Sequence, residues 1–99
     1  GNEVIVKYLV DHGANVHKEN IEGMTPLFYA CKSRNELVIK CLLDHMVEIN
    51  KKNIYGETPL FFACRRGNET LIKYLIEHGA DINKENWRKE TPVFYASKN

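Results

Sequence analysis

Hydrophobic and polar residues follow one another along the chain in blocks that recur every 33 residues. The segment TPLFYA at residues 25–30 returns as TPLFFA at residues 58–63 and as TPVFYA at residues 91–96. A fixed period of this length is the signature of architectures built from stacked structural repeats. The chain therefore holds three copies of one unit, and each copy can be compared with the other two.

A longer helix is predicted in each copy from its apolar pattern and from its ends. In the first copy, residues 2–13 (NEVIVKYLVDHG) open with the capping residue Asn2 and close with Gly13, which favours a helix end. The apolar residues cover more than one narrow stripe, as in a helix packed between neighbours. Equivalent helices are predicted to start at Asn35 and Asn68.

A shorter helix is predicted at each Thr-Pro pair, because threonine caps a helix and proline suits its first position. In the first copy this helix begins at Pro26 and ends near Ser33. The polar residues 14–24, with a turn-compatible glycine, are too irregular for a helix and predict a hairpin-like turn. The repeating unit is helix, tight turn, helix and hairpin.

These motifs resemble the ankyrin repeat family, whose pattern runs roughly G-x-TPLHxA and then GHxxxVxxLLxxGADxN. The match rests on Thr-Pro-Leu at 25–27 and 58–60, Gly-Ala-Asn at 13–15, Gly-Ala-Asp at 79–81, and Ile82-Asn83. The resemblance covers the whole chain. It implies an all-α solenoid of antiparallel helix pairs joined by β-hairpin-like turns, in which each unit buries its neighbour's apolar face.

The register of the copies divides residues 1–99, taken as one domain, into four parts: a half-repeat 1–20, full repeats 21–53 and 54–86, and a half-repeat 87–99. Repeat arrays normally end in units with polar outer faces, which both ends lack. We therefore expect a segment of a longer ankyrin array, with self-assembly of chains head to tail as the alternative.

Two departures from the family pattern change what we expect locally. Phenylalanine replaces the usual histidine after Thr-Pro-Leu, at Phe28, Phe61 and Phe94, so packing should replace the hydrogen bond of that histidine to threonine. Glycine positions hold Arg34, Met46 and Lys89. Each of these residues should lower the stability of the fold by about 1 kcal/mol if its backbone is left-handed. The middle copy holds two of the three, Arg34 and Met46, and should therefore be locally less stable.

Composition and charge argue against several classes of protein. The content of 43% hydrophobic and 27% charged residues in 99 suits one small globular domain, and the net charge of +1 gives no global reason to expect nucleic acid or membrane. No apolar run approaches the roughly 18 residues that span a bilayer, and no signal peptide is visible. We expect an intracellular protein, cytoplasmic or nuclear. Its cysteines, Cys31, Cys41 and Cys64, form no C-x-x-C pair and should be buried and reduced.

Histidine recurs once per copy, at His12, His45 and His78. A metal-binding row is one reading, but helices packed about 8 to 10 Å apart do not bring such a row within reach of one ion. A favourable interaction with the helix C-terminus is the preferred interpretation. Because no catalytic, phosphate-binding or metal motif appears either, we expect neither enzyme activity nor a cofactor or metal.

The candidate binding residues are those at which the copies disagree. The hairpin tips carry, in aligned rows, Ile21, Ile54 and Trp87, then Glu22, Tyr55 and Arg88, then Met24, Glu57 and Glu90. The short helices end with Lys32, Arg65 and Arg66. The resemblance implies that these rows share the concave face that binds partners. Exposed apolar groups at Ile21, Met24, Ile54, Tyr55 and Trp87 would then form a protein-binding surface. The alternative is that they pack only against the adjacent hairpin.

Two further readings stay open. The cations Lys32, Arg65, Arg66, Arg88 and Lys98 could hold nucleic acid or phosphate, but Glu22, Glu57 and Glu90 on the same face argue against it. The resemblance also implies that Asn50 and Asn83 could be substrates of an asparaginyl hydroxylase. A structural role in pinning the hairpin to the next unit is preferred for both. A protein-binding scaffold is the leading prediction for the chain.

Overall fold

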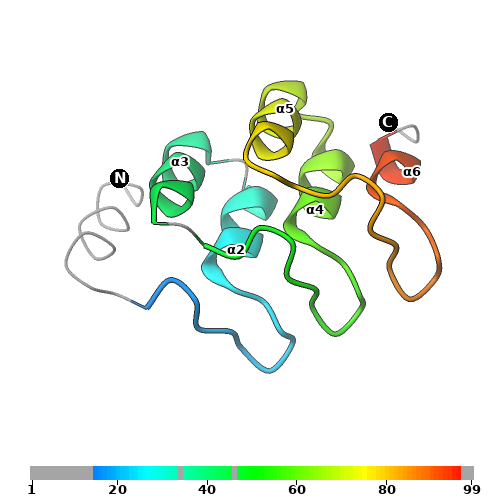
Figure 1. Cartoon of the computed structure of the whole chain (residues 1–99), viewed down its shortest axis with the longest axis horizontal. Coiled ribbons are helices and arrows are strands. Elements are labelled where there is room, and N and C mark those ends of the chain that lie inside the picture. The colour runs from blue at the N-terminus through cyan, green and yellow to red at the C-terminus, as the bar shows by residue number, and fades with distance from the viewer. Residues whose placement is uncertain (1–14, 34, 46, 97–99) are drawn as a thin grey trace.

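The computed structural model describes residues 15–33, 35–45 and 47–96, which form two rows of helices with loops projecting to one side (Figure 1). The short helices α2 (Pro26–Ser33), α4 (Pro59–Arg66) and α6 (Pro92–Ala96) make one row. The longer helices α3 (Glu36–Asp44) and α5 (Glu69–Glu77) make the other. Within the described ranges there is no strand, and the predicted all-α architecture is confirmed.

The longer helices begin where the capping residues predicted them. The Asn35 side chain accepts a hydrogen bond from the backbone amide of Val38 at 3.2 Å, and that of Asn68 accepts one from Leu71 at 3.1 Å. Each cap is followed by a glutamate in the first turn, which suits the positive end of the helix. None of these helices, in the part of the chain that the structure describes, could cross a membrane.

The histidines that end the longer helices bond to their own helix. The Nδ1 of His45 lies 2.8 Å from the carbonyl oxygen of Cys41, and that of His78 lies 2.9 Å from the carbonyl oxygen of Tyr74. The C-terminal interaction is therefore confirmed for these two, while His12 lies outside the described residues. Across the residues that are described, no three His, Cys, Asp or Glu side chains gather as metal ligands would.

The core lies between the two helix rows and continues from one repeat to the next. It is built from side chains with less than 2% exposure, among them Leu27, Ile39, Leu42, Leu71 and Leu75. Edge-to-face aromatic pairs join successive short helices, with ring centroids 5.6 Å apart for Phe28 and Phe62 and 5.8 Å for Phe61 and Tyr95. Such pairs add to the stability that apolar burial supplies, so each repeat is held by its neighbour.

Two of the three phenylalanines that replace the family's histidine pack as expected, and a threonine hydroxyl nearby is left without a hydrogen bond. Phe28 and Phe61 are fully buried, and Phe94 is 38% exposed. Thr58, which precedes α4, is also fully buried, and its Oγ1 is the one buried side-chain oxygen or nitrogen without a hydrogen-bond partner among the described residues. A buried hydroxyl in this state loses its hydration without compensation.

The cysteines Cys31, Cys41 and Cys64 are buried and form no disulfide with one another, as predicted. Burial raises the pKa of Cys31 to about 12 and that of Cys64 to about 11, because a thiolate would be desolvated there. These two thiols therefore stay protonated, and act as small apolar groups, at neutral pH.

One of the substituted glycine positions can be checked directly. Lys89 has φ of 62°, against 74° and 75° at the equivalent Gly23 and Gly56, so the expected left-handed backbone is confirmed. Arg34 and Met46 lie outside the described residues. The lower stability of the middle copy therefore stays a prediction, as do the repeat boundaries.

Replacing Thr58 by valine should stabilise the fold. Valine keeps the shape of threonine but removes the unsatisfied hydroxyl, so the free energy of unfolding should rise by about 1 kcal/mol. Urea denaturation followed by circular dichroism measures this change. The control Thr70→Val alters an exposed position on α5 and should stay within about 0.5 kcal/mol of the parent. A loss of stability in Thr58→Val would show that its hydroxyl is satisfied in solution.

Candidate functional site

Each hairpin is closed by one asparagine: Asn20, Asn53 or Asn86. Its side-chain oxygen accepts hydrogen bonds from the backbone amides two and four residues later, at 2.9 and 3.0 Å in all three hairpins. Its own backbone amide donates to the carbonyl oxygen four residues later, at 2.9 to 3.0 Å. These bonds fix the conformation of the loop that carries the candidate residues.

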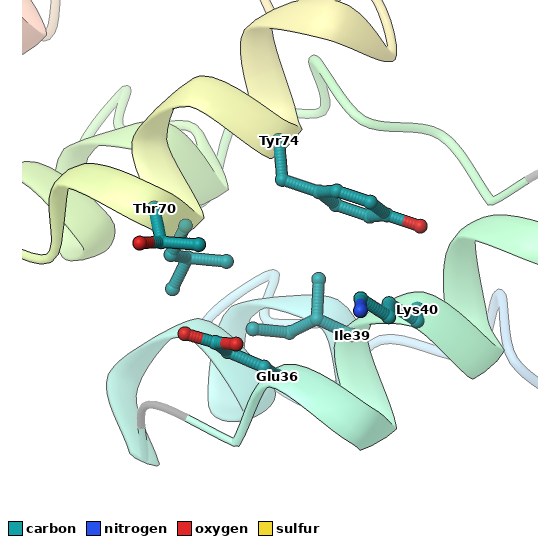
Figure 2. A pocket seen from close by; sticks show the side chains of 6 residues that line it. Glu36, Ile39, Lys40, Thr70 and Tyr74 are labelled. Atoms are coloured by element: carbon teal, nitrogen blue, oxygen red, sulfur yellow. The ribbon is translucent and has the colours of Figure 1, made fainter.

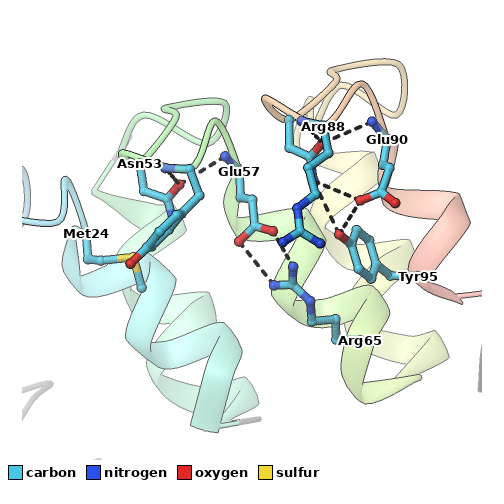
Figure 3. Close-up of polar contacts among 9 residues, drawn as sticks. Met24, Asn53, Glu57, Arg65, Arg88, Glu90 and Tyr95 are labelled. Carbon is cyan, nitrogen blue, oxygen red and sulfur yellow. Dashed lines mark hydrogen bonds and ion pairs between the residues drawn. The ribbon is translucent and has the colours of Figure 1, made fainter.

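The amide nitrogen of each asparagine ties its hairpin to other elements. Asn86 Nδ2 lies 3.3 Å from the Tyr95 hydroxyl, and Asn53 Nδ2 lies 3.3 Å from the sulfur of Met24 in the preceding repeat (Figure 3). Sequence reasoning missed these asparagines. Their recurrence every 33 residues, at Asn20, Asn53 and Asn86, was the signal that could have found them.

Successive hairpins are joined by backbone hydrogen bonds near their tips. The amide of Ile54 donates to the carbonyl oxygen of Glu22 at 3.0 Å, and the amide of Trp87 donates to that of Tyr55 at 3.2 Å. The indole N–H of Trp87 adds a bond of 2.7 Å to the carbonyl oxygen of Ile54. A Cβ built on Gly56 would lie 2.6 Å from the indole, so the ring rests directly on this glycine.

Of the five apolar residues that were predicted to be exposed, four are exposed in the structure and one is buried. Ile21 is 98% exposed, Ile54 53%, Tyr55 55% and Trp87 65%. The prediction for Met24 is wrong, because it is only 7% exposed. Its sulfur accepts the hydrogen bond from Asn53, which places the side chain beneath the following hairpin.

Glu57 is also not the freely variable surface residue that was predicted. It is 7% exposed, and its carboxylate receives two hydrogen bonds from the Arg65 guanidinium, to Oε1 at 3.2 Å and to Oε2 (Figure 3). Glu90, in the same aligned row, is half-buried and accepts a bond of 2.5 Å from the Tyr95 hydroxyl. Glu57 and Glu90, which follow the glycine position of their hairpins, therefore point toward the short helices, where Arg65 and Tyr95 bind them.

Two aromatic rings also contact the Arg65 guanidinium. Its central carbon lies 4.3 Å from the ring centre of Tyr95 and 5.4 Å from that of Phe62. Partial burial alone would lower the pKa of Arg65, but the hydrogen bond and charge of Glu57 and the contact with Tyr95 outweigh it and raise that pKa. The arginine is therefore a fixed cation at the joint between α4 and α6.

These side chains surround an open concavity of about 430 Å³ between the second and third hairpins. It brings together five of the predicted residues, Tyr55, Glu57, Arg65, Trp87 and Arg88, and adds Asn86 and Tyr95, which were not predicted as binding residues. The remaining exposed candidates do not line it; they are Ile21, Glu22, Lys32, Ile54 and Arg66. In Figure 3, Arg88 and Glu90 come from the hairpin beside α6 and face Glu57 and Arg65.

A second hollow, of about 80 Å³, lies between the longer helices α3 and α5, away from the hairpins (Figure 2). Ile39 and Leu71 form its floor, and Lys40 and Tyr74 stand at its edge, with the lysine nitrogen 5.6 Å from the ring centre. A volume of this size holds no more than a few water molecules. It is a packing gap and not a candidate site.

Asn50 has the structural role that was preferred for it. Its side chain donates to the carbonyl oxygen of Gly79 at 3.0 Å and accepts from the amide of Asp81 at 2.7 Å, both in the next repeat. The equivalent Asn83 is exposed, and its backbone amide donates to the Asp81 side chain at 2.8 Å. Modification of either asparagine stays an untested reading.

Alanine at Gly56 should destabilise the protein more than alanine at Gly79. Both glycines have positive φ, of 75° and 99°, so each substitution carries a backbone cost of about 1 kcal/mol. At Gly79 an added Cβ meets nothing within 4 Å, whereas at Gly56 it collides with Trp87. We expect Gly56→Ala to cost a further 1 to 3 kcal/mol or so in urea denaturation. Equal losses would contradict the close packing of the two hairpins.

Removing either partner of the Glu57–Arg65 pair should destabilise the fold. A double-mutant cycle with Glu57→Gln and Arg65→Gln should give a coupling energy of about 1 to 2 kcal/mol, because each group is left partly buried without its partner. The control cycle uses the pair Glu19–Lys51, at 2.7 Å, whose glutamate is exposed whereas Glu57 is buried, and should give a smaller coupling. Urea denaturation of the two sets measures both. Equal couplings would show that solvent screens the Glu57–Arg65 pair.

Comparison with known families agrees with the repeated architecture. A family model described as "Ankyrin repeats (3 copies)" matches residues 1–53 and, in a second overlapping match, residues 35–99. The two matches together span the chain. No curated protein sequence matches it significantly.

Proposed function

Because the chain belongs to the ankyrin repeat family, we propose that it is a protein-binding scaffold whose partner lies on the concave face of the hairpins and short helices. Ankyrin repeats generally serve as protein–protein interaction scaffolds, and the family is typically non-enzymatic. One observation supports placing the partner-binding site on this face. Tyr55 and Trp87, each more than half exposed, both line the concavity of about 430 Å³ between the second and third hairpins.

The aromatic rim has the properties of an interface hot spot. Tryptophan, tyrosine and arginine are enriched at such sites, because they offer a large apolar contact and a polar group on the same side chain. Here Trp87 and Tyr55 come from adjacent hairpins whose backbones are hydrogen-bonded to each other, and the Trp87 indole is further held by the carbonyl oxygen of Ile54. Arg88 and Arg65 supply the polar part of the lining.

The exposed tips extend this surface beyond the concavity. Ile21 and Ile54 are more than half exposed, and Glu22, Lys32 and Arg66 lie exposed on the hairpins and short helices. A partner that covered the tips and the concavity together would bury apolar groups at its centre and leave charged groups at its rim. Head-to-tail association and a longer array stay predictions, since they depend on residues 1–14 and 97–99, outside the described residues.

Substitution of the two aromatic residues tests this assignment. Trp87→Ala and Tyr55→Ala should each reduce affinity capture of partners from the source cell by about tenfold or more, because hot-spot aromatics cost at least 2 kcal/mol when truncated. Ile76→Ala is the matched control, because Ile76 is 43% exposed but lies on α5, away from the hairpins. Circular dichroism melting verifies that each variant is folded. Unchanged capture by both aromatic variants would contradict binding at this face.

A further inference from the structure

The carboxylates of the concave face are bound within the protein. Glu57 is paired with Arg65, and Glu90 accepts hydrogen bonds from the Tyr95 hydroxyl at 2.5 Å and from Asn86 at 3.4 Å. Glu22 accepts one from the Tyr55 hydroxyl at 3.4 Å. These three carboxylates therefore join hairpins and helices, and Glu57 is the one whose contact here is with a cation.

The concavity itself carries more positive than negative charge. Its lining holds two guanidinium groups, Arg65 and Arg88, against the single carboxylate of Glu57. Arg88 is exposed, and the salt bridges found among the described residues, Glu19–Lys51 and Glu57–Arg65, do not include it. At the edge, Lys52 adds a cation, its nitrogen 4.7 Å from the ring centre of Trp87, and Glu90, bonded to the lining residue Tyr95, adds a carboxylate. One positive charge therefore stays in excess, and Arg88 is the exposed cation of the lining.

The same contacts disfavour a cationic ligand group. The chain's own cations already occupy a face of two of the rings in the lining, with Lys52 over Trp87 and Arg65 over Tyr95. A second cation would have to displace them and would meet Arg88. A carboxylate would meet instead the exposed Arg88 guanidinium, with which it can form charge-assisted hydrogen bonds.

We propose that this concavity binds an acidic segment of the partner protein, with one carboxylate on Arg88 and an adjacent apolar side chain against Tyr55 and the exposed edge of Trp87. The volume of about 430 Å³ lies within the roughly 300 to 1,000 Å³ of ligand sites and takes one or two side chains. This inference rests on the proposed function and names the chemistry of the partner. It is favoured over nucleic acid because the site is a local hollow beside an exposed apolar residue, Ile54, whose carbonyl oxygen accepts the hydrogen bond of the Trp87 indole.

The test uses the sole tryptophan of the sequence as a reporter, because Trp87 lines the site. Three fluorescein-labelled peptides in a Gly-Ser frame are titrated, with the cores Glu-Phe-Asp-Glu, Gln-Phe-Asn-Gln and Lys-Phe-Lys-Lys. The acidic peptide should bind with a change in Trp87 emission, and more tightly than the neutral and basic ones. Arg88→Gln should weaken its binding about tenfold or more, since a charge-assisted hydrogen bond is lost. Lys73→Gln, which removes an exposed cation on α5, should leave the affinity unchanged.

The remaining outcomes overturn the inference. They are equal or tighter binding of the neutral or basic peptide, absence of binding by all three, or insensitivity of the acidic peptide to Arg88→Gln. Tighter binding of a thymidine oligonucleotide, with a steep loss of affinity as salt rises, would assign the cations to nucleic acid.

A selection of random peptides on the immobilised protein separates this inference from the proposed function. Selected peptides that lose binding in Trp87→Ala but carry no excess of acidic residues would refute the acidic partner and leave the binding face intact. Selected peptides that bind Trp87→Ala and Tyr55→Ala as well as the parent would refute the face itself.

Discussion

The arrangement of the hairpins depends on one amide side chain in each, that of Asn20, Asn53 or Asn86. An amide oxygen has two lone pairs, so it can accept both backbone hydrogens that the loop would otherwise leave unpaired. Two such bonds contribute about 2 kcal/mol net, and losing their acceptor in a buried place would cost more. That place is buried for Asn53 and Asn86, which are 4% and 5% exposed, whereas Asn20 is exposed. In the second and third hairpins water therefore has little access with which to replace the amide.

The closed hairpins in turn decide which side chains face inward and which face solvent. The side chains that follow the glycine position, Glu57 and Glu90, point toward the short helices, where they bind Arg65 and Tyr95. The tip residues are left outside, and the stacking of Trp87 on Gly56 sets the wall of the concavity. One local geometry, repeated along the chain, thus produces both the polar joints between repeats and the exposed aromatic rim.

The features that could be predicted from the sequence are those determined within a single copy. The caps at Asn35 and Asn68 and the short helix at Pro26 depend on neighbours a few residues away, and the structure agrees with them. Burial of Met24 could not be predicted in this way, because it depends on Asn53 of the next copy. The binding of Glu57 by Arg65 depends likewise on how the hairpin folds over α4. Contacts between elements, which no pattern within one copy records, decided these cases.

The backbone of the hairpins has a consequence for the entropy of binding. A flexible loop that became ordered on contact with a partner would lose about 1 to 2 kcal/mol of backbone conformational entropy per residue. Here the amides of Tyr55 and Glu57 are held by Asn53, and those of Arg88 and Glu90 by Asn86, before any partner arrives. That entropy is already lost when the chain folds, so a larger share of the contact energy appears as affinity.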